Sequence, residues 1–344
     1  MTDLDFISLL EGILGEGLSL IKLQGDASYR IYYRAILPSR KSYIVMKMPA
    51  GKASASEEVT NLKEKPTEPP FLSVDRLLKA QGLPVPEILH YDAGHGLIVL
   101  EDFGDETFER RILRSTETEK RLWYQKAIDL LILFQQKTLN GPPDSIAHRR
   151  SFDATLLNWE FEHFLEYGIE VRLGKNITAE DLAAIHERTT AITRSLTLMP
   201  PVLVHRDFQS RNLMIQDEAL KLLDFQDALM GPLPYDLVAL LRDSYIALPP
   251  DLLLELVSYY VSRKNAGGDA IVPAEFQKMF DLMTIQRKLK DAGRFVYIDR
   301  VKGNPSFLKH IPNSLSYVRD AFERQTEQRP LFELLKKYVP EFTR

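Results

Sequence analysis

The pattern of apolar and polar positions divides the chain into a strand-rich beginning and a helix-rich remainder. Three short runs come first: Leu18–Leu23 alternates weakly, Tyr29–Leu37 is rich in aromatic and β-branched residues, and Ser42–Met48 follows them. Two further apolar runs lie near Ile88–Tyr91 and Leu97–Leu100. Runs of this length, bounded by turn residues, are typical of strands. The pattern therefore predicts an N-terminal sheet.

Helices are predicted on both sides of the first three strands. A short amphipathic helix, Leu4–Leu14, precedes them, and another helix is predicted near Phe71–Gln81. Between the third strand and that helix, Gly51–Pro70 is polar and contains three prolines, which predicts a mobile loop.

Beyond Gly104 the apolar residues recur at the spacing of helices. The helices predicted there are Glu117–Leu139, Phe152–Tyr167, Thr178–Leu198, Pro234–Ala247, Asp251–Arg263, Ala274–Ala292 and Asn313–Thr326. We therefore expect two lobes: a sheet lobe over residues 1–102 and a mainly helical lobe over residues 103–344.

The composition is that of an ordinary globular protein without a basic excess. Hydrophobic residues make up 44% and charged residues 27% of the chain, enough to bury a sizeable core. The net charge of −4 does not support nucleic acid or an anionic membrane as a partner, and no obligate protein partner is indicated. The chain has no cysteine, and its N-terminus lacks the basic segment of a signal peptide, so the cytoplasm is the expected compartment. The longest apolar runs are too short to span a bilayer.

The segment from Val204 to Ala228, VHRDFQSRNLMIQDEALKLLDFQDA, carries the candidate chemistry. Asp207 and Asn212 share one predicted loop, and Asp224 follows at the end of a short predicted hairpin. Phosphoryl transfer needs a carboxylate that accepts the proton of the attacking hydroxyl, and oxygen ligands that hold Mg²⁺ against the phosphates. Asp207 suits the first task, and Asn212 and Asp224 suit the second.

Asp and Asn are also frequent turn residues, so each of these three could instead close a turn. The context favours the catalytic interpretation, because the loop lies between two strand-like runs, Pro201–Val204 and Leu220–Leu223. His205 is expected to be structural, and no proton transfer is assigned to it.

Two features of the N-terminal strands suit a nucleotide site. The turn between the first two strands contains small residues whose backbone amides can approach a phosphate closely. These residues are Gly25, Asp26, Ala27 and Ser28. Lys47 lies on the third strand, where kinases carry a lysine that contacts the α- and β-phosphates. Hairpin turns and solvated strand lysines are common, but their order along this chain favours the nucleotide interpretation.

The chain contains, in order, the segments GDASYRIYYR, VMK, LEDFG, HRDFQSRN and LDFQDA. This order resembles the aminoglycoside-phosphotransferase-like small-molecule kinases. More narrowly, it is similar to the bacterial cell-wall amino-sugar kinases, which phosphorylate N-acetylmuramate and N-acetylglucosamine at the anomeric hydroxyl. The later segments GPLPYDLVALLRDSY and QRKLKDAGRF extend the resemblance over nearly the whole chain. It implies an α+β, protein-kinase-like fold with an antiparallel sheet lobe, and a reaction that uses ATP and Mg²⁺.

The resemblance also implies roles for individual positions. The small-residue turn would cover the nucleotide phosphates, Lys47 would bind them, and Glu101, Asp102 and Phe103 would form the hinge that meets adenine. In the catalytic segment the resemblance implies that Asp207 is the base and that Asn212 and Asp224 bind Mg²⁺, as their spacing also predicts.

One departure from the protein kinases bears on the substrate. The Asp-Phe pair is followed by Gln226 rather than glycine, and no Ala-Pro-Glu signature follows, which argues against a protein substrate. The carboxylate that would pair with the strand lysine stays open among Asp75, Glu57 and Glu58.

Four polar residues are candidates for contact with the phosphate acceptor. Arg211, Gln226, Asp227 and Arg242 lie near the catalytic segment in sequence and could pair sugar hydroxyls and an acetamido group, or could be solvated instead. Choline, an aminoglycoside or a hydroxy amino acid would suit the same chemistry. A broad acidic pocket would favour an aminoglycoside, and an aromatic cage would favour choline. A catalytically inactive nucleotide-binding module is a further alternative, which the presence of base, metal ligands and lysine disfavours.

Overall fold

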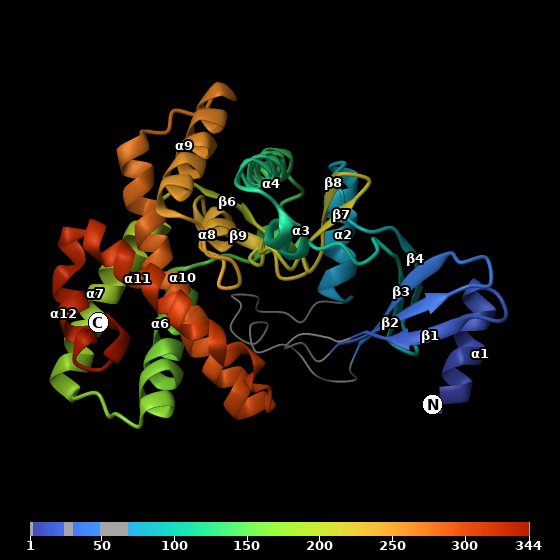
Figure 1. Cartoon of the computed structure of the whole chain (residues 1–344), viewed down its shortest axis with the longest axis horizontal. Coiled ribbons are helices and arrows are strands. Elements are labelled where there is room, and N and C mark those ends of the chain that lie inside the picture. The colour runs from blue at the N-terminus through green and yellow to red at the C-terminus, as the bar shows by residue number, and fades with distance from the viewer. Residues whose placement is uncertain (1–2, 24–29, 49–67, 344) are drawn as a thin grey trace.

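The computed structural model describes residues 3–23, 30–48 and 68–343. The turn predicted at Gly25–Ser28 and nearly all of the loop predicted at Gly51–Pro70 lie outside these residues, as do Glu57 and Glu58. The described chain leads from a sheet beside the N-terminus to a group of helices around the C-terminus (Figure 1). This arrangement confirms the predicted α+β fold with an N-terminal sheet and a larger helical part.

The N-terminal sheet is antiparallel, with the strand order β1-β2-β3-β5-β4. Its strands are β1 (Ser19–Lys22), β2 (Ile31–Ile36), β3 (Ser42–Lys47), β4 (Ile88–Asp92) and β5 (Leu97–Glu101). All coincide with runs predicted from the sequence, because each is a short apolar run between turn residues.

The two faces of this sheet are covered by different helices. Helix α1 (Asp3–Leu14) packs on one face, where Phe6 and Val45 belong to a small separate core. Helix α2 (Pro70–Ala80) packs on the opposite face, where Met46 joins the main core. Successive side chains of a strand point to opposite faces, so these neighbouring residues of β3 serve different cores.

Helices form most of the chain beyond the sheet. They are α3 (Phe108–Arg114), α4 (Glu117–Thr138), α5 (Ile146–Arg149), α6 (Ala154–His163), α7 (Ala179–Thr197), α8 (Tyr235–Leu241), α9 (Pro250–Ala266), α10 (Pro273–Lys302), α11 (Ile311–Arg324) and α12 (Arg329–Lys336). A π-helical stretch, Phe164–Val171, continues α6. None of the helices in the described part of the chain has the length and apolar character needed to cross a membrane.

Two of these helices end far from the predicted positions. Helix α8 ends at Leu241 rather than near Ala247, and the carboxylate of Asp243 then accepts backbone hydrogen bonds that compete with a further helical turn. Helix α10 continues past the predicted end to Lys302, where Gly303 takes a left-handed φ of 70°. The apolar pattern of α10 weakens earlier because polar residues of its last turns line a cavity.

The catalytic segment lies between strands of two short two-stranded sheets. β6 (Pro201–Val204) pairs with β9 (Leu229–Pro232), and β7 (Leu213–Gln216) pairs with β8 (Ala219–Leu222). The predicted catalytic loop connects β6 to β7. The amide of Leu223 donates to the carbonyl of Asn212 at 2.9 Å, so the end of this loop lies beside the residue that precedes Asp224.

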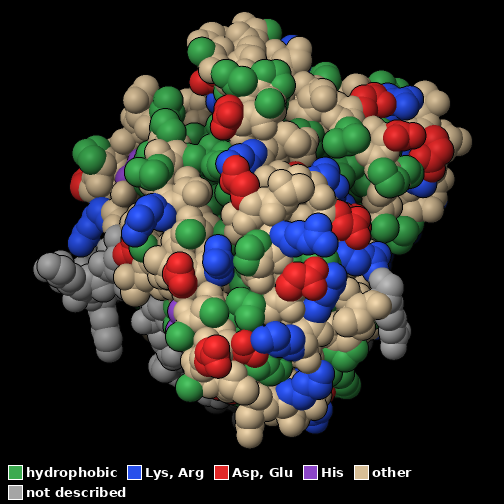
Figure 2. Space-filling view, turned by 90° about the vertical axis from the view of Figure 1, so that its left-hand side faces the viewer, with side chains coloured by type: hydrophobic (Ala, Val, Ile, Leu, Met, Phe, Trp, Pro, Cys, Tyr) green, Lys and Arg blue, Asp and Glu red, His purple; other side chains and the backbone are tan. Residues whose placement is uncertain are grey.

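Helix α10, with 30 residues, passes through the helical part in contact with α6, α8 and α11. Gly293 lies where α10 meets the end of α6: a Cβ at this position would be 2.8 Å from the carbonyl oxygen of His163 and 2.8 Å from Cα of Phe164. The close approach of the two helices therefore needs glycine here. On the outer surface of the helical end, basic and acidic side chains are interspersed (Figure 2).

Candidate active site

The loop that holds the candidate base is anchored by a buried carboxylate. Asp236, in the first turn of α8, accepts hydrogen bonds from the amides of His205 and Arg206 at 2.6 and 3.0 Å. Burial raises the pKa of Asp236 to about 7 although these bonds oppose the shift. The ring of His205 lies between Phe134 and Phe208, and burial lowers its pKa to about 4. A neutral, enclosed ring fits the structural role expected for His205.

Asp207 extends from this loop into a cavity. Its side chain is 32% exposed, and Nε2 of Gln209 donates to its Oδ1 at 3.3 Å. Behind it, the guanidinium of Arg287 on α10 lies 3.6 Å from the same oxygen and 4.6 Å from the ring centroid of Tyr235. Arg287 is fully buried, so a fixed positive charge stands behind the carboxylate. Asp207 thus has one side held by the protein and one side open to a ligand.

Asp224 follows β8 in a backbone conformation that is unusual for a residue other than glycine. Its φ is 62°, in the left-handed region. The next residue, Phe225, stacks on Phe71 of α2 with ring centroids 4.9 Å apart, which joins the turn to the sheet side of the molecule. The turn therefore aims the Asp224 carboxylate into the cavity.

Polar and charged side chains lie around the Asp224 carboxylate. Nε2 of Gln226 donates to it at 2.9 Å, and the guanidinium of Arg30, just before β2, lies 3.4 Å away. Partial loss of hydration inside the cavity, together with repulsion from Asp207, raises the pKa of Asp224 to about 6. A cation bound here would offset that repulsion.

Asn212 and Asp224 fit a Mg²⁺ site. Both line the same cavity, and the side-chain amide nitrogen of Asn212 donates to the carbonyl of Asp207 at 2.9 Å. The amide oxygen of Asn212 is then the atom left for a metal. Mg²⁺ takes few protein oxygens and completes its shell with phosphate and water. The residues that the structure describes include no group of three or more His, Cys, Asp or Glu suited to holding a metal.

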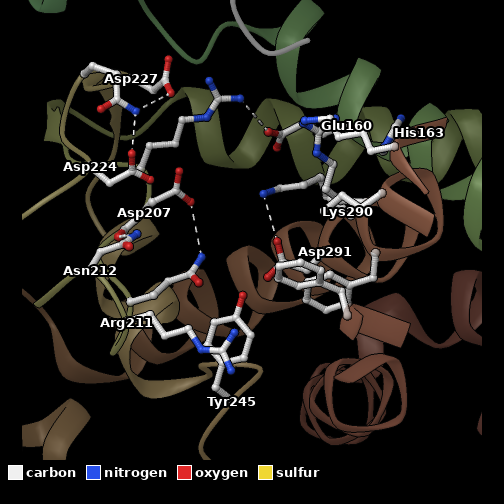
Figure 3. A pocket seen from close by; sticks show the side chains of 18 of the residues that line it. Glu160, His163, Asp207, Arg211, Asn212, Asp224, Asp227, Tyr245, Lys290 and Asp291 are labelled. Atoms are coloured by element: carbon white, nitrogen blue, oxygen red, sulfur yellow. Dashed lines mark hydrogen bonds and ion pairs between the residues drawn. The ribbon is translucent and has the colours of Figure 1, made fainter. Parts of the chain in front are cut away.

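The cavity has a volume of about 240 Å³ and charged walls. Figure 3 shows Asp207 and Asp224 on one side, and Glu160, Lys290 and Asp291 on the other. The charged residues that line it are Arg30, Glu160, Arg206, Asp207, Arg211, Asp224, Asp227, Lys290, Asp291, Arg294 and Lys302. Basic and acidic groups are nearly balanced, so this is not an acidic pocket.

Several of these charges are paired within the protein. Glu160 lies 3.5 Å from Arg206, and Asp291 lies 2.6 Å from Lys288 and 3.0 Å from Lys290. Although burial acts to raise it, the two ammonium groups hold the pKa of Asp291 well below its usual range. The acidic groups on this wall are therefore largely neutralised before a ligand arrives.

Lys47 does not line this cavity, and its contact with the nucleotide phosphates stays a prediction. Alternation along β3 puts it on the face of Val45, which α1 covers, and its ammonium group lies 5.0 Å from the ring centroid of Phe6. The face toward the main core belongs to Met46. The sheet side contributes a different cation to the cavity, Arg30.

Asp75, the described candidate for the carboxylate that pairs with Lys47, lies on a different side of the sheet from this lysine. Asp75 is buried on α2, where burial raises its pKa to about 6. Lys47 belongs to the opposite face of the sheet, so the structure does not bring the two together.

The predicted hinge residues lie at the end of β5. The carboxylate of Asp102 pairs with Nε of Arg34 at 2.6 Å and accepts the amide of Gly104 at 2.9 Å, so it braces the connection out of the sheet. A main-chain contact between Glu101 or Phe103 and adenine stays a prediction.

Three of the four predicted acceptor residues line the cavity: Arg211, Gln226 and Asp227. Gln226 also donates to Asp227 at 3.1 Å, and its buried side-chain oxygen has no hydrogen-bond partner among the described residues. The guanidinium of Arg211 lies 3.7 Å from the ring centroid of Tyr245 and pairs with Glu109 at 3.0 Å.

The fourth predicted acceptor residue, Arg242, does not reach the cavity. It is buried at the end of α8, 4.9 Å from the ring centroid of Tyr317 and 3.5 Å from Asp320 on α11. The early end of α8 leaves it facing α11, so the structure does not bring Arg242 to the cavity that holds the other three residues.

Sequence reasoning missed six cations at or near the site: Arg30, Arg206, Arg287, Lys290, Arg294 and Lys302. A signal was present for most of them, since Arg30 ends the segment GDASYR and three others fall within QRKLKDAGRF. Charged residues at helical spacing usually face solvent, and only the packing of α10 shows that these face inward.

Comparisons with known proteins agree with this geometry. A model of the phosphotransferase enzyme family matches residues 19–270. An N-acetylmuramate/N-acetylglucosamine kinase of Neisseria meningitidis is 32% identical over 91% of this chain and 89% of its own length. A protein of the same name from Pseudomonas aeruginosa is 31% identical over 92% of this chain and 87% of its own length.

Solved structures with the same fold include two kinds of small-molecule kinase. A choline kinase from Streptococcus pneumoniae matches with a TM-score of 0.61 at 17% identity, over 92% of this chain and 99% of that one. An aminoglycoside phosphotransferase in complex with gentamicin matches with a TM-score of 0.61 at 14% identity, over 92% and 96%. These similarities confirm the kinase-like, two-lobed fold.

Proposed function

The chain belongs to the phosphotransferase enzyme family, and on this premise we propose that it transfers the γ-phosphate of ATP to the anomeric hydroxyl of N-acetylmuramate or N-acetylglucosamine. The observation that carries the proposal is the meeting of Asp207, Asn212 and Asp224 at one cavity. The two bacterial relatives, which carry the names of kinases for this sugar pair, support the choice of acceptor.

In this proposal Asp207 is the base. Its carboxylate faces the cavity, and the loop behind it is held by Asp236. As the hydroxyl oxygen bonds to phosphorus, the carboxylate accepts the hydroxyl proton. An anomeric hydroxyl is more acidic than an ordinary alcohol, so a carboxylate base needs less driving force to take its proton.

The nucleotide phosphates would lie near Asp224 and Arg30. Asn212 and Asp224 would hold Mg²⁺, which when bound neutralises charge on the phosphates. Arg30 suits a phosphate contact because its fork of donors matches phosphate oxygens, and it already reaches within 3.4 Å of Asp224. Main-chain groups of Glu101 and Phe103 are proposed to meet adenine.

The charge of the cavity supports a neutral or acidic acceptor. A polycationic aminoglycoside would need a broad acidic pocket, whereas Glu160 and Asp291 are already paired with internal cations. Choline would need an open aromatic cage. At this cavity the ring of Tyr245 is covered by the guanidinium of Arg211 at 3.7 Å. The other aromatic rings of the lining stack within the wall, Trp159 on His163 and Phe295 on Phe307, with centroids 5.3 and 5.8 Å apart.

A small molecule is therefore the expected partner, and the volume of about 240 Å³ supports this. ATP is made and kept inside cells, so we expect the reaction to take place in the cytoplasm.

The product of the reaction tests the proposal. The protein would be incubated with ATP, Mg²⁺ and either sugar, with Asp207→Asn as the background, and the product examined by phosphorus NMR. We expect a sugar 1-phosphate whose phosphorus couples to the anomeric proton and whose ester is labile to mild acid. A 6-phosphate, or turnover with choline or an aminoglycoside alone, would refute the amino-sugar acceptor and leave the kinase chemistry standing.

A further inference from the structure

Arg287, in the middle of α10, is a buried charge to which the proposed reaction assigns no role. Its side chain has no exposed surface, and none of its three side-chain nitrogens has a hydrogen-bond partner among the described residues. Taking a guanidinium out of water is costly unless an opposite charge lies close to it. The position of Arg287 therefore depends on the carboxylates around it.

The carboxylate that Arg287 pairs with is that of Asp207. Oδ1 of Asp207 is 3.6 Å from Nη2 of Arg287, and no other cation in the described part of the chain lies within ion-pair distance of Asp207. Two further carboxylates near Arg287, those of Asp291 and Glu160, have other partners. Asp291 contacts two lysine ammonium groups at 2.6 and 3.0 Å, and Glu160 lies 3.5 Å from another guanidinium. Arg287 is thus available to Asp207.

This ion pair engages one oxygen of the Asp207 carboxylate and leaves the other. Nε2 of Gln209 donates to Oδ1 at 3.3 Å, so Gln209 and Arg287 both lie on the Oδ1 side. Among the residues that the structure describes, none donates a hydrogen bond to Oδ2. Oδ2 is therefore the oxygen that remains for the acceptor hydroxyl in the cavity.

The Asp207 carboxylate needs such a hold because negative charge lies beside it. Asp224 is on the same side of the cavity (Figure 3), and loss of hydration and then the charge of Asp207 raise the pKa of Asp224 to about 6. The phosphates of ATP would add further negative charge. Arg287 is itself fixed in place, since its guanidinium lies 4.6 Å from the ring centroid of Tyr235 and α10 packs against α6, α8 and α11. A side chain locked by its packing can hold the carboxylate against this repulsion.

We propose that Arg287 is the positioning residue of the base: its guanidinium holds Oδ1 of Asp207, so that Oδ2 faces the acceptor hydroxyl. As the hydroxyl oxygen bonds to the γ-phosphorus and the bond from that phosphorus to ADP breaks, the hydroxyl proton passes to Oδ2, and Arg287 keeps its own protons. Arg287 does not line the cavity, so it acts through Asp207 and not on either substrate. The inference rests on the proposed function, because it requires Asp207 to be the base.

A double-mutant cycle tests this role. Arg287→Met removes the charge, and Arg287→Lys keeps the charge without the planar fork of donors. Each is made in the parent protein and in Asp207→Asn, and kcat and KM are measured with whichever sugar the parent phosphorylates faster. Arg242→Met is the matched control, because Arg242 is also a buried arginine, its guanidinium lies 3.5 Å from a different carboxylate, that of Asp320, and it does not line the cavity.

The expected losses depend on whether the base is present. A displacement of about 1 Å at a reacting group costs on the order of 10²-fold in rate. We therefore expect Arg287→Met to lower kcat about 10- to 100-fold in the parent protein, with each KM changed less than about threefold, but to lower kcat less than about threefold in Asp207→Asn. Arg287→Lys should lower the parent kcat by a smaller factor, about three- to tenfold. Arg242→Met should change kcat by the same factor in both backgrounds.

Equal losses from Arg287→Met in the two backgrounds would refute the role, because the arginine would then act independently of Asp207. A parent kcat that stays within about threefold would refute it as well. Thermal unfolding shows whether each variant keeps its fold, and if Arg287→Met does not fold, Arg287→Lys is compared in the two backgrounds with the same criteria. The proposed function fails separately, and the inference with it, if the parent phosphorylates neither sugar or if Asp207→Asn retains more than about a tenth of the parent kcat.

Discussion

Arg206 and Asp224 have left-handed backbone conformations, with φ of 77° and 62°, on either side of the catalytic segment. Such a conformation costs a non-glycine residue on the order of 1–3 kcal/mol and persists only where the surroundings impose it. At Arg206 the imposing contact is the Asp236 carboxylate, and at Asp224 it is the stack of Phe225 on α2. Individual residues thus store strain where it directs the two aspartates into the cavity.

The residue expected to matter most for rate is Asp207. Asp207→Asn keeps the size of the side chain but cannot accept a proton, so kcat should fall by about 10²–10⁴. ATP binding, measured by calorimetry, should be nearly unchanged. A variant that retains more than about a tenth of the parent kcat would exclude Asp207 as the base.

Arg30 is the side chain proposed to contact the ATP phosphates. Arg30→Met should lower kcat/KM for ATP by about 10- to 100-fold, since a charge-assisted contact contributes about 1.5–3 kcal/mol. Lys47→Met is the matched control, because that lysine packs on Phe6 beyond the other face of the sheet. Steady-state kinetics with varied ATP compare the two. A large loss in Lys47→Met with little effect in Arg30→Met would restore the lysine to the nucleotide site.

At the scale of elements, helix α10 shapes the cavity at two places. Its buried face supplies Arg287 behind Asp207, and its last turns supply Arg294, Ile298 and Lys302 to the lining. Both depend on how closely α10 approaches α6, and Gly293 permits that approach.

Gly293→Ala should therefore destabilise the protein. Alanine in a helix normally gains about 1 kcal/mol over glycine, but here the added Cβ would lie 2.8 Å from backbone atoms of α6, and overpacking costs about 1–3 kcal/mol. Gly12→Ala in α1 is the control, since nothing lies within 4 Å of its Cβ position. Scanning calorimetry should show a lower Tm for the first and an unchanged or higher Tm for the second; equal shifts would mean that α10 can move aside freely.

At the scale of the whole molecule, buried ionisable groups act on stability in opposite directions. Burial lowers the pKa of His163 and His205 to about 4, so the unfolded chain binds more protons at these sites and stability is lost as pH falls below about 6.5. Burial raises the pKa of Asp75 to about 6 and that of Asp236 to about 7, so these groups reduce stability as pH rises from about 4.

A single variant can isolate one of these opposing contributions. At pH 5, keeping His163 neutral in the folded protein costs about 2 kcal/mol relative to pH 8, and His163→Gln removes this cost. The free energy of unfolding should therefore decrease less from pH 8 to pH 5 in the variant than in the parent, by about 2 kcal/mol. Urea unfolding at the two pH values measures this, with the pH 8 values accounting for changed packing. Identical pH dependence would contradict a buried, neutral His163.

The sequence by itself determined what depends on neighbours along the chain. The strands of the sheet, most helices and the loop-and-hairpin arrangement of Asp207, Asn212 and Asp224 follow from local periodicity and turn residues. Because β7 and β8 form a tight local hairpin, the spacing alone brings Asn212 beside the residue before Asp224.

Only the tertiary structure decided which face of each element a ligand meets. Alternation along β3 shows that Lys47 and Met46 point in opposite directions, but the packing of α1 on one face and α2 on the other decides which of them faces the main core. Likewise Arg242 is near the catalytic segment in sequence yet turns to α11, whereas Lys302 is far away in sequence and lines the cavity. The physical reason is that burial and contact between distant segments are properties of packed elements, and a one-dimensional pattern specifies two faces without specifying their surroundings.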